Sequence, residues 1–134
     1  MLAPCNTVNL WGKITKIAKG PQIIKDWVGT NGIAVDRTLA QSRTDICLKC
    51  EHNHIDSKII EAAGDLIKEY IEFKNQMGLR VNGEKSLHQC DVCLCALRLK
   101  IWCPSEIIKA RLNPGELDNY PSFCWIRTEI GSQL

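Results

Sequence analysis

The sequence contains no long apolar run and no export signal that can be recognised. No stretch approaches the roughly 18 consecutive apolar residues needed to cross a bilayer, so no membrane-spanning segment is expected. The opening residues, MLAPCNTVNLWGK, lack the basic segment followed by an apolar run that marks a signal peptide. These absences predict a cytoplasmic location (host cytoplasm for a viral protein). In such a reducing compartment, clustered cysteines more often bind metal or do chemistry than form disulfides.

The sequence also lacks a strong charge of one sign. Its 17 basic and 15 acidic side chains give a net charge of +2, too small to indicate nucleic-acid binding. The basic excess lies in residues 1–50, which carry seven basic and three acidic side chains. Lys13, Lys16 and Lys19 are part of it. A solvated helix face is the simplest interpretation of these lysines, and contact with phosphate or an acidic partner is the alternative.

Motifs of several enzyme classes are missing. There is no HExxH, no nucleobase-deaminase pattern ending in PCxxC, no glycine-rich phosphate loop and no GxSxG. The sequence therefore predicts a protein without enzymatic activity and without a small-molecule substrate.

Apolar periodicity in the 134 residues predicts several helices. They are expected near residues 7–18, 21–28, 37–46, 57–77 and 105–112. Asp36 is expected to cap the third, and Ser105 the last. In the 57–77 helix a wide apolar stripe is expected to face the core; it comprises Ile59, Ala63, Leu66, Tyr70 and Phe73, with Ile60, Ile67 and Ile71 beside them.

Three segments are predicted to be extended. Asn82-Gly83 is a turn signal, which suggests a short hairpin over residues 79–90. The segment ALRLKIW, residues 96–102, alternates apolar and polar side chains like a half-buried strand. The tail SFCWIRTEI, residues 122–130, is expected to be a last strand.

Four of the eight cysteines form two CxxC pairs. Cys47 with Cys50 and Cys90 with Cys93 can supply four thiolates to one tetrahedral Zn²⁺, at about 2.3 Å each. The 39 residues between the pairs include the long predicted helix, and folding that helix as an excursion brings the pairs together. The sequence thus predicts one structural zinc ion, with Cys95 as the alternate ligand to Cys93.

Other uses of these cysteines stay open. A thioredoxin-like redox pair and an iron–sulfur cluster both use cysteines at such spacings, although the redox motif normally follows a strand at a helix N-terminus. Packing is the simplest role for Cys95, and the roles of Cys5, Cys103 and Cys124 are undetermined. His52, His54 and His88 are expected at the surface, although His52 or His54 could support or replace a thiolate.

The segments LAQSRTDICLKCEHN and CDVCLCALRLKIWCP, followed by a late CWI, resemble a group of small uncharacterised phage and prophage zinc-knuckle proteins. In that group an AxxR helix leads into CxxC, and CxxCxC and a Cys-Trp pair follow. The resemblance covers roughly residues 25–127. It implies that Cys47, Cys50, Cys90, Cys93 and Cys95 form the metal region and that the protein is viral; Cys103 departs from the pattern.

These observations predict an α+β fold, a helix-rich single domain with a small zinc-knuckle or zinc-ribbon-like β element. Residues 1–30 are assigned to an N-terminal helical arm and residues 31–134 to the zinc-knuckle domain. The expected function is a zinc-stabilised, non-enzymatic module that binds a protein partner, in virion assembly or host-factor modulation. Nucleic-acid binding and a thiol-based redox or metalloenzyme are the alternatives. Candidate partner contacts are Trp11, Lys13, Lys16, Lys19, Trp27, Arg98 and Lys100. For Trp11 and Trp27, packing in the core is the simpler interpretation.

Overall fold

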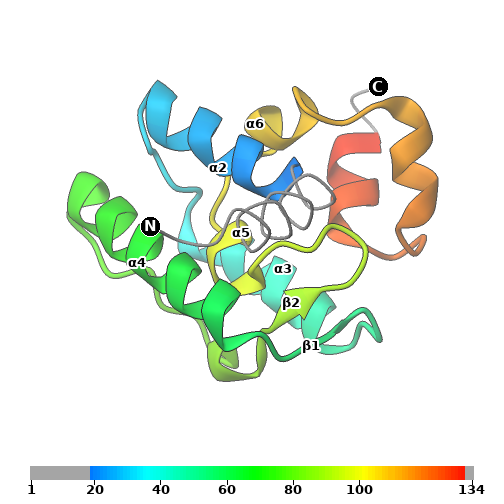
Figure 1. Ribbon diagram of the computed structural model, residues 1–134, viewed down its shortest axis with the longest axis horizontal. Coiled ribbons are helices and arrows are strands. Elements are labelled where there is room, and N and C mark those ends of the chain that lie inside the picture. The colour runs from blue at the N-terminus through cyan, green and yellow to red at the C-terminus, as the bar shows by residue number, and fades with distance from the viewer. Residues whose placement is uncertain (1–18, 132–134) are drawn as a thin grey trace, which may run out of the picture.

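A computed structural model describes residues 19–131 (Figure 1). The protein is rich in helix and has one small antiparallel sheet. The elements, in chain order, are α2 (Lys19–Thr30), α3 (Arg37–Leu48), β1 (Asn53–Ile55), α4 (Lys58–Asn75), η1 (Glu84–Ser86), β2 (Gln89–Cys90), α5 (Leu97–Lys100), α6 (Ser105–Lys109), η2 (Pro114–Asn119) and η3 (Ile126–Ile130). No helix in this part of the chain is both long enough and apolar enough to cross a membrane.

The long helices begin and end close to where the sequence predicts. Asp36 caps α3, because its side chain accepts a hydrogen bond of 2.8 Å from the amide of Leu39. Ser57 caps α4 through the amide of Ile60, and Gln76 ends that helix in a left-handed conformation. α6 begins at Ser105 itself, so its capping position is Pro104 and the prediction is wrong there by one residue.

The sheet joins segments on either side of α4. β1 and β2 pair antiparallel, with Asn53 opposite Cys90. The predicted hairpin around Asn82-Gly83 is wrong, because residues 84–86 turn into the 3-10 helix η1 and β2 pairs with β1 instead. The sheet therefore brings the end of the first CxxC pair beside the start of the second.

Two other predicted strands are helical. Residues 97–100 form α5, and residues 126–130 form η3, a π-helix. The alternation in ALRLKIW did not mark a surface strand, because Leu97, Leu99, Lys100, Ile101 and Trp102 are all buried. Only Arg98 in this segment is partly exposed, so the alternation does not separate a buried face from a solvent face.

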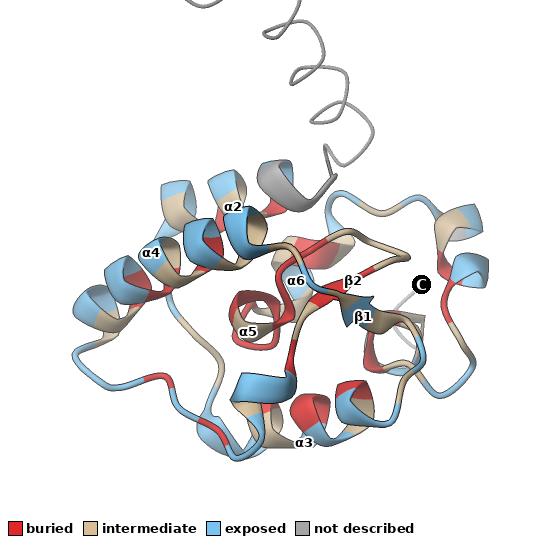
Figure 2. Cartoon of the chain, turned by 60° about the horizontal axis from the view of Figure 1, so that its bottom comes forward, coloured by how far each residue is buried: buried red, intermediate tan, exposed pale blue. Residues whose placement is uncertain are grey.

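The core surrounds α5, which lies at the centre of the molecule (Figures 1 and 2). Trp27, Trp102 and Trp125 are its largest fully buried side chains. Trp27 and Ile23 come from α2, so residues 19–30 pack into the same core as the rest of the described chain. The predicted arm is therefore not separate from the domain over these residues, and its first 18 residues lie outside the described part.

The outer part of the apolar stripe of α4 faces solvent, so the predicted burial is wrong for those residues, whereas Ile71 is buried and Ile67 packs against the core. Ile59 is 83% exposed, Leu66 69% and Phe73 79%. The opposite face packs on the protein through the buried residues Gly64, Lys68 and Ile71.

That contact is close because Gly64 has no side chain. A Cβ at this position would lie 2.9 Å from the Cβ of Ala96, just before α5. We expect Gly64→Ala to destabilise the fold by about 1 kcal/mol, because the cost of overpacking exceeds the gain in helix propensity. A Cβ at Gly29, in α2, would have nothing within 4 Å, so Gly29→Ala should stabilise by about 0.5 kcal/mol. Urea unfolding of both variants measures the difference in sign.

A buried arginine joins α3 to α5 and η3. Arg43 is fully buried, and its guanidinium donates two hydrogen bonds to the carboxylate of Glu129, at 2.7 and 3.0 Å. It also donates to the carbonyls of Ile101 and Cys103, at 2.9 and 2.7 Å, and lies 4.2 Å from the centre of the Trp125 ring. This side chain therefore fixes the position of the Cys47 end of α3 relative to the last helix.

Candidate metal centre

The first CxxC pair lies in the turn that ends α3. Cys47 is buried in the last turn of the helix, and the amide of Cys50 donates to its carbonyl at 3.1 Å. The indole N–H of Trp125 donates to the sulfur of Cys47 at 3.3 Å. Burial raises the pKa of the Cys47 thiol to about 12, although the bond from Trp125 opposes this shift.

The second CxxC pair lies in a tight loop after β2. The amide of Val92 donates to the sulfur of Cys90 at 3.4 Å, and the amide of Cys93 also bonds that sulfur. The amide of Leu94 donates to the carbonyl of Cys90 at 2.7 Å, and Leu94 itself has a left-handed backbone, with a φ of 60°. The loop thus turns backbone N–H groups toward its thiols, an arrangement that stabilises thiolates.

Both pairs face one small enclosed cavity of about 20 Å³. It is also lined by a fifth cysteine, Cys124, which precedes η3. The sulfur of Cys124 accepts hydrogen bonds from the amides of Ile126 and Arg127. A cavity of this size has room for one water-sized sphere, which is also the room that a single metal ion needs. Among the lining residues are Cys47, Cys50, Cys90, Cys93, Cys124, Lys100, Tyr120 and Trp125.

A buried lysine accompanies the thiols. Lys100 is only 4% exposed, and its Nζ lies 3.4 Å from the sulfur of Cys95. In the described part of the chain, no carboxylate is within ion-pair distance of it. Burial alone would lower the pKa of Lys100, but the charges of Cys93 and Cys95 offset this and hold it well above its usual value. The thiol cluster is therefore the counter-charge of a buried ammonium group.

Negative charge in the cluster concentrates on Cys93. Hydrogen bonds from the thiols of Cys90 and Cys95 hold the pKa of Cys93 well below its usual value. The same bonds, together with burial, raise the pKa of Cys90 and of Cys95. This site stabilises thiolate, which is the form of cysteine that binds metal.

The cysteines that line the cavity are suitable ligands for a soft metal ion, but their sulfur atoms are farther apart than in a metal-bound site. No three sulfur atoms of the described cysteines lie within 4.8 Å of one another. In a tetrahedral zinc site, neighbouring sulfurs are about 3.8 Å apart, as the Zn–S distance of about 2.3 Å requires. Binding of an ion therefore requires the thiols to move inward around the cavity.

Two other cysteines of the described chain, Cys95 and Cys103, lie outside the cavity lining. Cys95, the predicted alternate ligand, is buried and contacts Cys93 and Lys100. Cys103 is 1% exposed, and its sulfur is 3.7 Å from the carbonyl of Pro104. Cys5 lies outside the described residues. The sequence did not assign Cys124 to the site; its place beside Trp125 was the one signal that could have found it.

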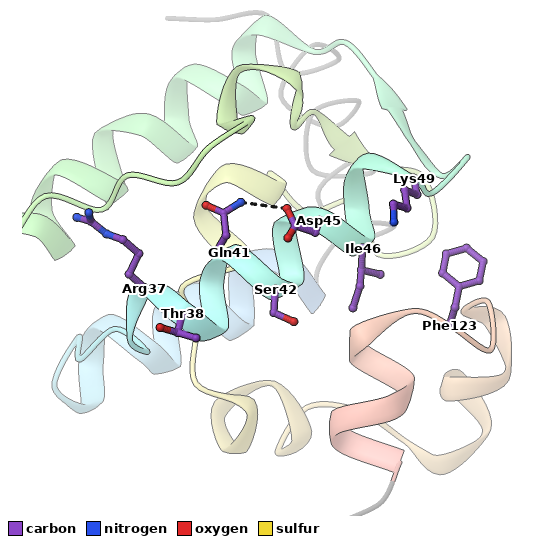
Figure 3. A pocket seen from close by; sticks show the side chains of 8 residues that line it. All are labelled: Arg37, Thr38, Gln41, Ser42, Asp45, Ile46, Lys49 and Phe123. Carbon is purple, nitrogen blue, oxygen red and sulfur yellow. Dashed lines mark hydrogen bonds between the residues drawn. The ribbon is translucent and has the colours of Figure 1, made fainter.

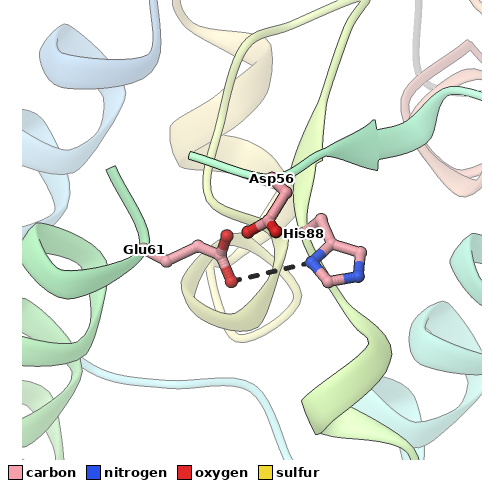
Figure 4. Close-up of side chains that lie close together, drawn as sticks. All are labelled: Asp56, Glu61 and His88. Carbon is pink, nitrogen blue, oxygen red and sulfur yellow. Dashed lines mark ion pairs between the residues drawn. The ribbon is translucent and has the colours of Figure 1, made fainter. Parts of the chain in front are cut away.

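A second cluster joins Asp56, Glu61 and His88 (Figure 4). It is the one group of three ligand side chains in residues 19–131 whose ligand atoms lie within 4.8 Å of one another. Arg98 already pairs with one of its two carboxylates, because its guanidinium donates to Glu61 at 2.5 Å. A cation would have to compete with this guanidinium, so the cluster is an unfavourable metal site.

The two histidines after the first CxxC pair bracket Asp91. His52 Nδ1 and His54 Nε2 each lie 2.6 Å from an oxygen of that carboxylate. Although partial burial opposes it, the hydrogen bonds from both imidazoles lower the pKa of Asp91. This cluster fastens the segment after Cys50 to the loop that carries Cys90 and Cys93.

Several predicted partner contacts are not accessible at the surface. Trp27 is fully buried, and its indole donates to the carbonyl of Ile33 at 2.8 Å. Lys100 is buried among the thiols, and Arg98 is half-buried and paired with Glu61 and Asp65. Trp11, Lys13 and Lys16 lie outside the described residues, and Lys19 is the first residue of α2.

An open groove of about 890 Å³ follows the outer side of α3 (Figure 3). Arg37 and Lys49 lie at its two ends, and Phe123, which is 50% exposed, stands beside Lys49. Gln41 and Asp45 are hydrogen-bonded to each other within it, at 3.1 Å. The groove does not reach the thiol cavity, whose lining it shares only at Ile46.

No protein-family model, curated protein or solved structure matches the chain. The function proposed below therefore rests on the geometry of the site.

Proposed function

We propose that the protein is a zinc-stabilised, non-enzymatic interaction module. The observation that carries this proposal is the convergence of both CxxC pairs on one cavity of about 20 Å³. These pairs come from the end of α3 and from the loop after β2, which are separated by α4. A metal ion there would cross-link two segments that are far apart in the chain.

Zinc suits this site better than an iron–sulfur cluster. Thiolates arranged around one point favour Zn²⁺ or iron. A four-iron cluster is much larger than the single sphere that the cavity accommodates, whereas one zinc ion is not. Four thiolates and Zn²⁺ together carry a charge of −2, and the buried ammonium of Lys100 would offset part of it.

The proposed ligands are Cys47, Cys50, Cys90 and Cys93. Four protein ligands close the coordination sphere and leave no position for a reacting water, which is typical of structural rather than catalytic zinc. Cys124 lines the same cavity and is the competitor of the half-buried Cys50. Binding of zinc would require the thiols to move toward the ion and to lose their protons.

Single serine variants test this ligand set. After dialysis against a weak chelator, elemental analysis should find about one zinc per chain in the wild type. Cys95→Ser and Cys124→Ser should keep it, because neither residue is a proposed ligand, whereas Cys50→Ser should lose most of it. If Cys124→Ser loses zinc and Cys50→Ser keeps it, then Cys124 rather than Cys50 is the fourth ligand. Absence of stoichiometric zinc from the wild type would contradict the proposal.

The interaction part of the proposal is supported by the exposed side chains of α4. Ile59, Leu66 and Phe73 lie on one face and are between 69% and 83% exposed. Large exposed apolar patches on soluble domains mark interaction sites. The nucleic-acid alternative loses support, since Lys100 is buried and Arg98 is paired with carboxylates. A phage context for the partner rests on the sequence resemblance alone.

A further inference from the structure

α4 presents an apolar face to solvent. Three of its charged side chains bond to the rest of the protein: Glu61 to Arg98, Lys68 to Glu84 at 2.8 Å, and Glu72 to the amide of Leu79 at 2.8 Å. Ile67 and Ile71 pack on the core from the same side, whereas Ile59, Leu66 and Phe73 are exposed; the exposed outer side of α4 is visible in Figure 2. From this face we infer that α4 forms a parallel two-stranded coiled coil with α4 of a second copy of the chain.

The spacing of the exposed residues fits such a seam. Apolar residues recur at steps of four, three, four and three, at Ile59, Ala63, Leu66, Tyr70 and Phe73. All five are exposed, the least of the large ones being Tyr70 at 43%. This is the heptad pattern, with Ala63 and Tyr70 at a positions and the other three at d positions. The 18-residue helix is about 27 Å long, so the seam would run along its whole length.

The other side of the helix is already occupied, so the seam cannot belong to the core of the same domain. Gly64 lies at a b position, where a Cβ would be 2.9 Å from Ala96. Ile71, also at a b position, is fully buried. The domain thus holds α4 as a preformed helix with its a and d positions outward, which lowers the entropic cost of pairing.

The charges that flank the seam select a second copy in parallel orientation. Among the e and g positions within α4, only Glu69 and Lys74 are charged, at g and e respectively. In a parallel pair, a g residue faces the e residue five positions further along the partner helix. Glu69 of each copy would therefore face Lys74 of the other, twice per dimer. Both side chains are exposed, and neither has an ion pair within residues 19–131.

An antiparallel pair would lose this match. There g positions face g positions and e positions face e positions, so the single acid and the single base of each copy would not meet. The parallel arrangement also places a two-fold axis along the seam, which closes the assembly at two copies. The inference rests on the interaction part of the proposed function and is independent of zinc.

Sedimentation velocity of the full-length, zinc-loaded chain over a concentration series tests the seam. The wild type should dimerise, and Leu66→Glu should weaken the dimer at least about tenfold, because it places two carboxylates in an apolar interface. Phe123→Glu is the matched control: it charges an exposed aromatic residue at the α3 groove and should leave the dimer unchanged. Circular dichroism and zinc content should be the same in all three proteins.

A charge-swap cycle tests the orientation. Glu69→Lys and Lys74→Glu should each weaken the dimer, by roughly threefold to tenfold, because each creates two like-charge contacts. The double variant E69K/K74E should recover the wild-type dissociation constant. A wild type that stays monomeric, or a dimer indifferent to Leu66→Glu, would overturn the proposed seam. A double variant as weak as the singles would overturn the parallel orientation. Neither result would change the zinc content, so failure here is distinguishable from failure of the zinc site.

Discussion

Removal of the proposed zinc ion should abolish the cooperative unfolding transition of the protein. Structural zinc contributes on the order of 10 kcal/mol of apparent binding free energy, while the total stability of a domain is about 5–15 kcal/mol. The thiols that line the cavity come from the end of α3, the loop after β2 and the segment before η3. Without an ion, no metal–thiolate bond would join these three segments.

Thermal unfolding followed by circular dichroism measures this effect, with and without a strong chelator. We expect a sharp transition for the zinc-loaded chain and a broad one, or none, after chelation. Adding zinc in excess of the chelator should restore the sharp transition, which controls for direct effects of the chelator. An unchanged midpoint after the metal has been removed, as verified by elemental analysis, would show that the fold does not need the ion.

Arg43→Met should destabilise the protein by about 3–5 kcal/mol. Methionine approximates the aliphatic part of arginine but removes the hydrogen bonds that Arg43 donates to the carboxylate of Glu129 and to the carbonyls of Ile101 and Cys103. A cost of this size is expected because two backbone carbonyls lose their donor next to the fully buried position 43, and each such loss costs about 1–3 kcal/mol. Urea unfolding of the zinc-loaded variant gives the change in free energy of unfolding.

A second arginine provides the matched control. Arg111 also pairs through two hydrogen bonds with a carboxylate, that of Asp26, at 2.6 and 3.0 Å. Its side chain is 41% exposed, whereas that of Arg43 is fully buried. Arg111→Met should therefore cost no more than about 1 kcal/mol. Equal effects of the two substitutions would contradict the role assigned to the burial of Arg43.

The helices could be predicted because their signals are local. Asp36 and Ser57 are capping residues three positions before the amides they bond, and each is followed by helical periodicity. The sequence signal for the proposed metal ligands was also partly local, since each CxxC pair by itself brings two thiols together. That both pairs line one cavity was inferred from the excursion of α4 between them, and the pairing of β1 with β2 now explains it.

The orientation of α4 could not be predicted from its periodicity. A helical pattern separates an apolar face from a polar one but does not say which face meets the domain. Here Glu61 and Lys68 lie against the domain beside Ile71, because Arg98 and Glu84, which follow α4 in the sequence, pair with them. Those partners lie 16 or more residues away, so no local signal reveals them.

The position of Cys124 in the cavity lining could not be predicted from the sequence for a similar reason. It has no second cysteine nearby in the sequence, and it reaches the cavity only because η3 is held against α3 by Arg43 and Glu129. Likewise, the alternation of residues 96–102 predicted a strand, although the segment is central and only Arg98 in it is partly exposed. Short apolar segments of this kind are compatible with either a helix or a strand, and their surroundings decide between them.

X-ray absorption at the zinc edge of the purified, zinc-loaded protein observes the proposed ligands themselves. A four-thiolate site predicts a first shell of four sulfur atoms at about 2.3 Å, with no nitrogen or oxygen ligand. A first shell dominated by nitrogen or oxygen at about 2.0 Å would contradict the proposed zinc site, because it would place the ion away from the cavity that Cys47, Cys50, Cys90 and Cys93 line.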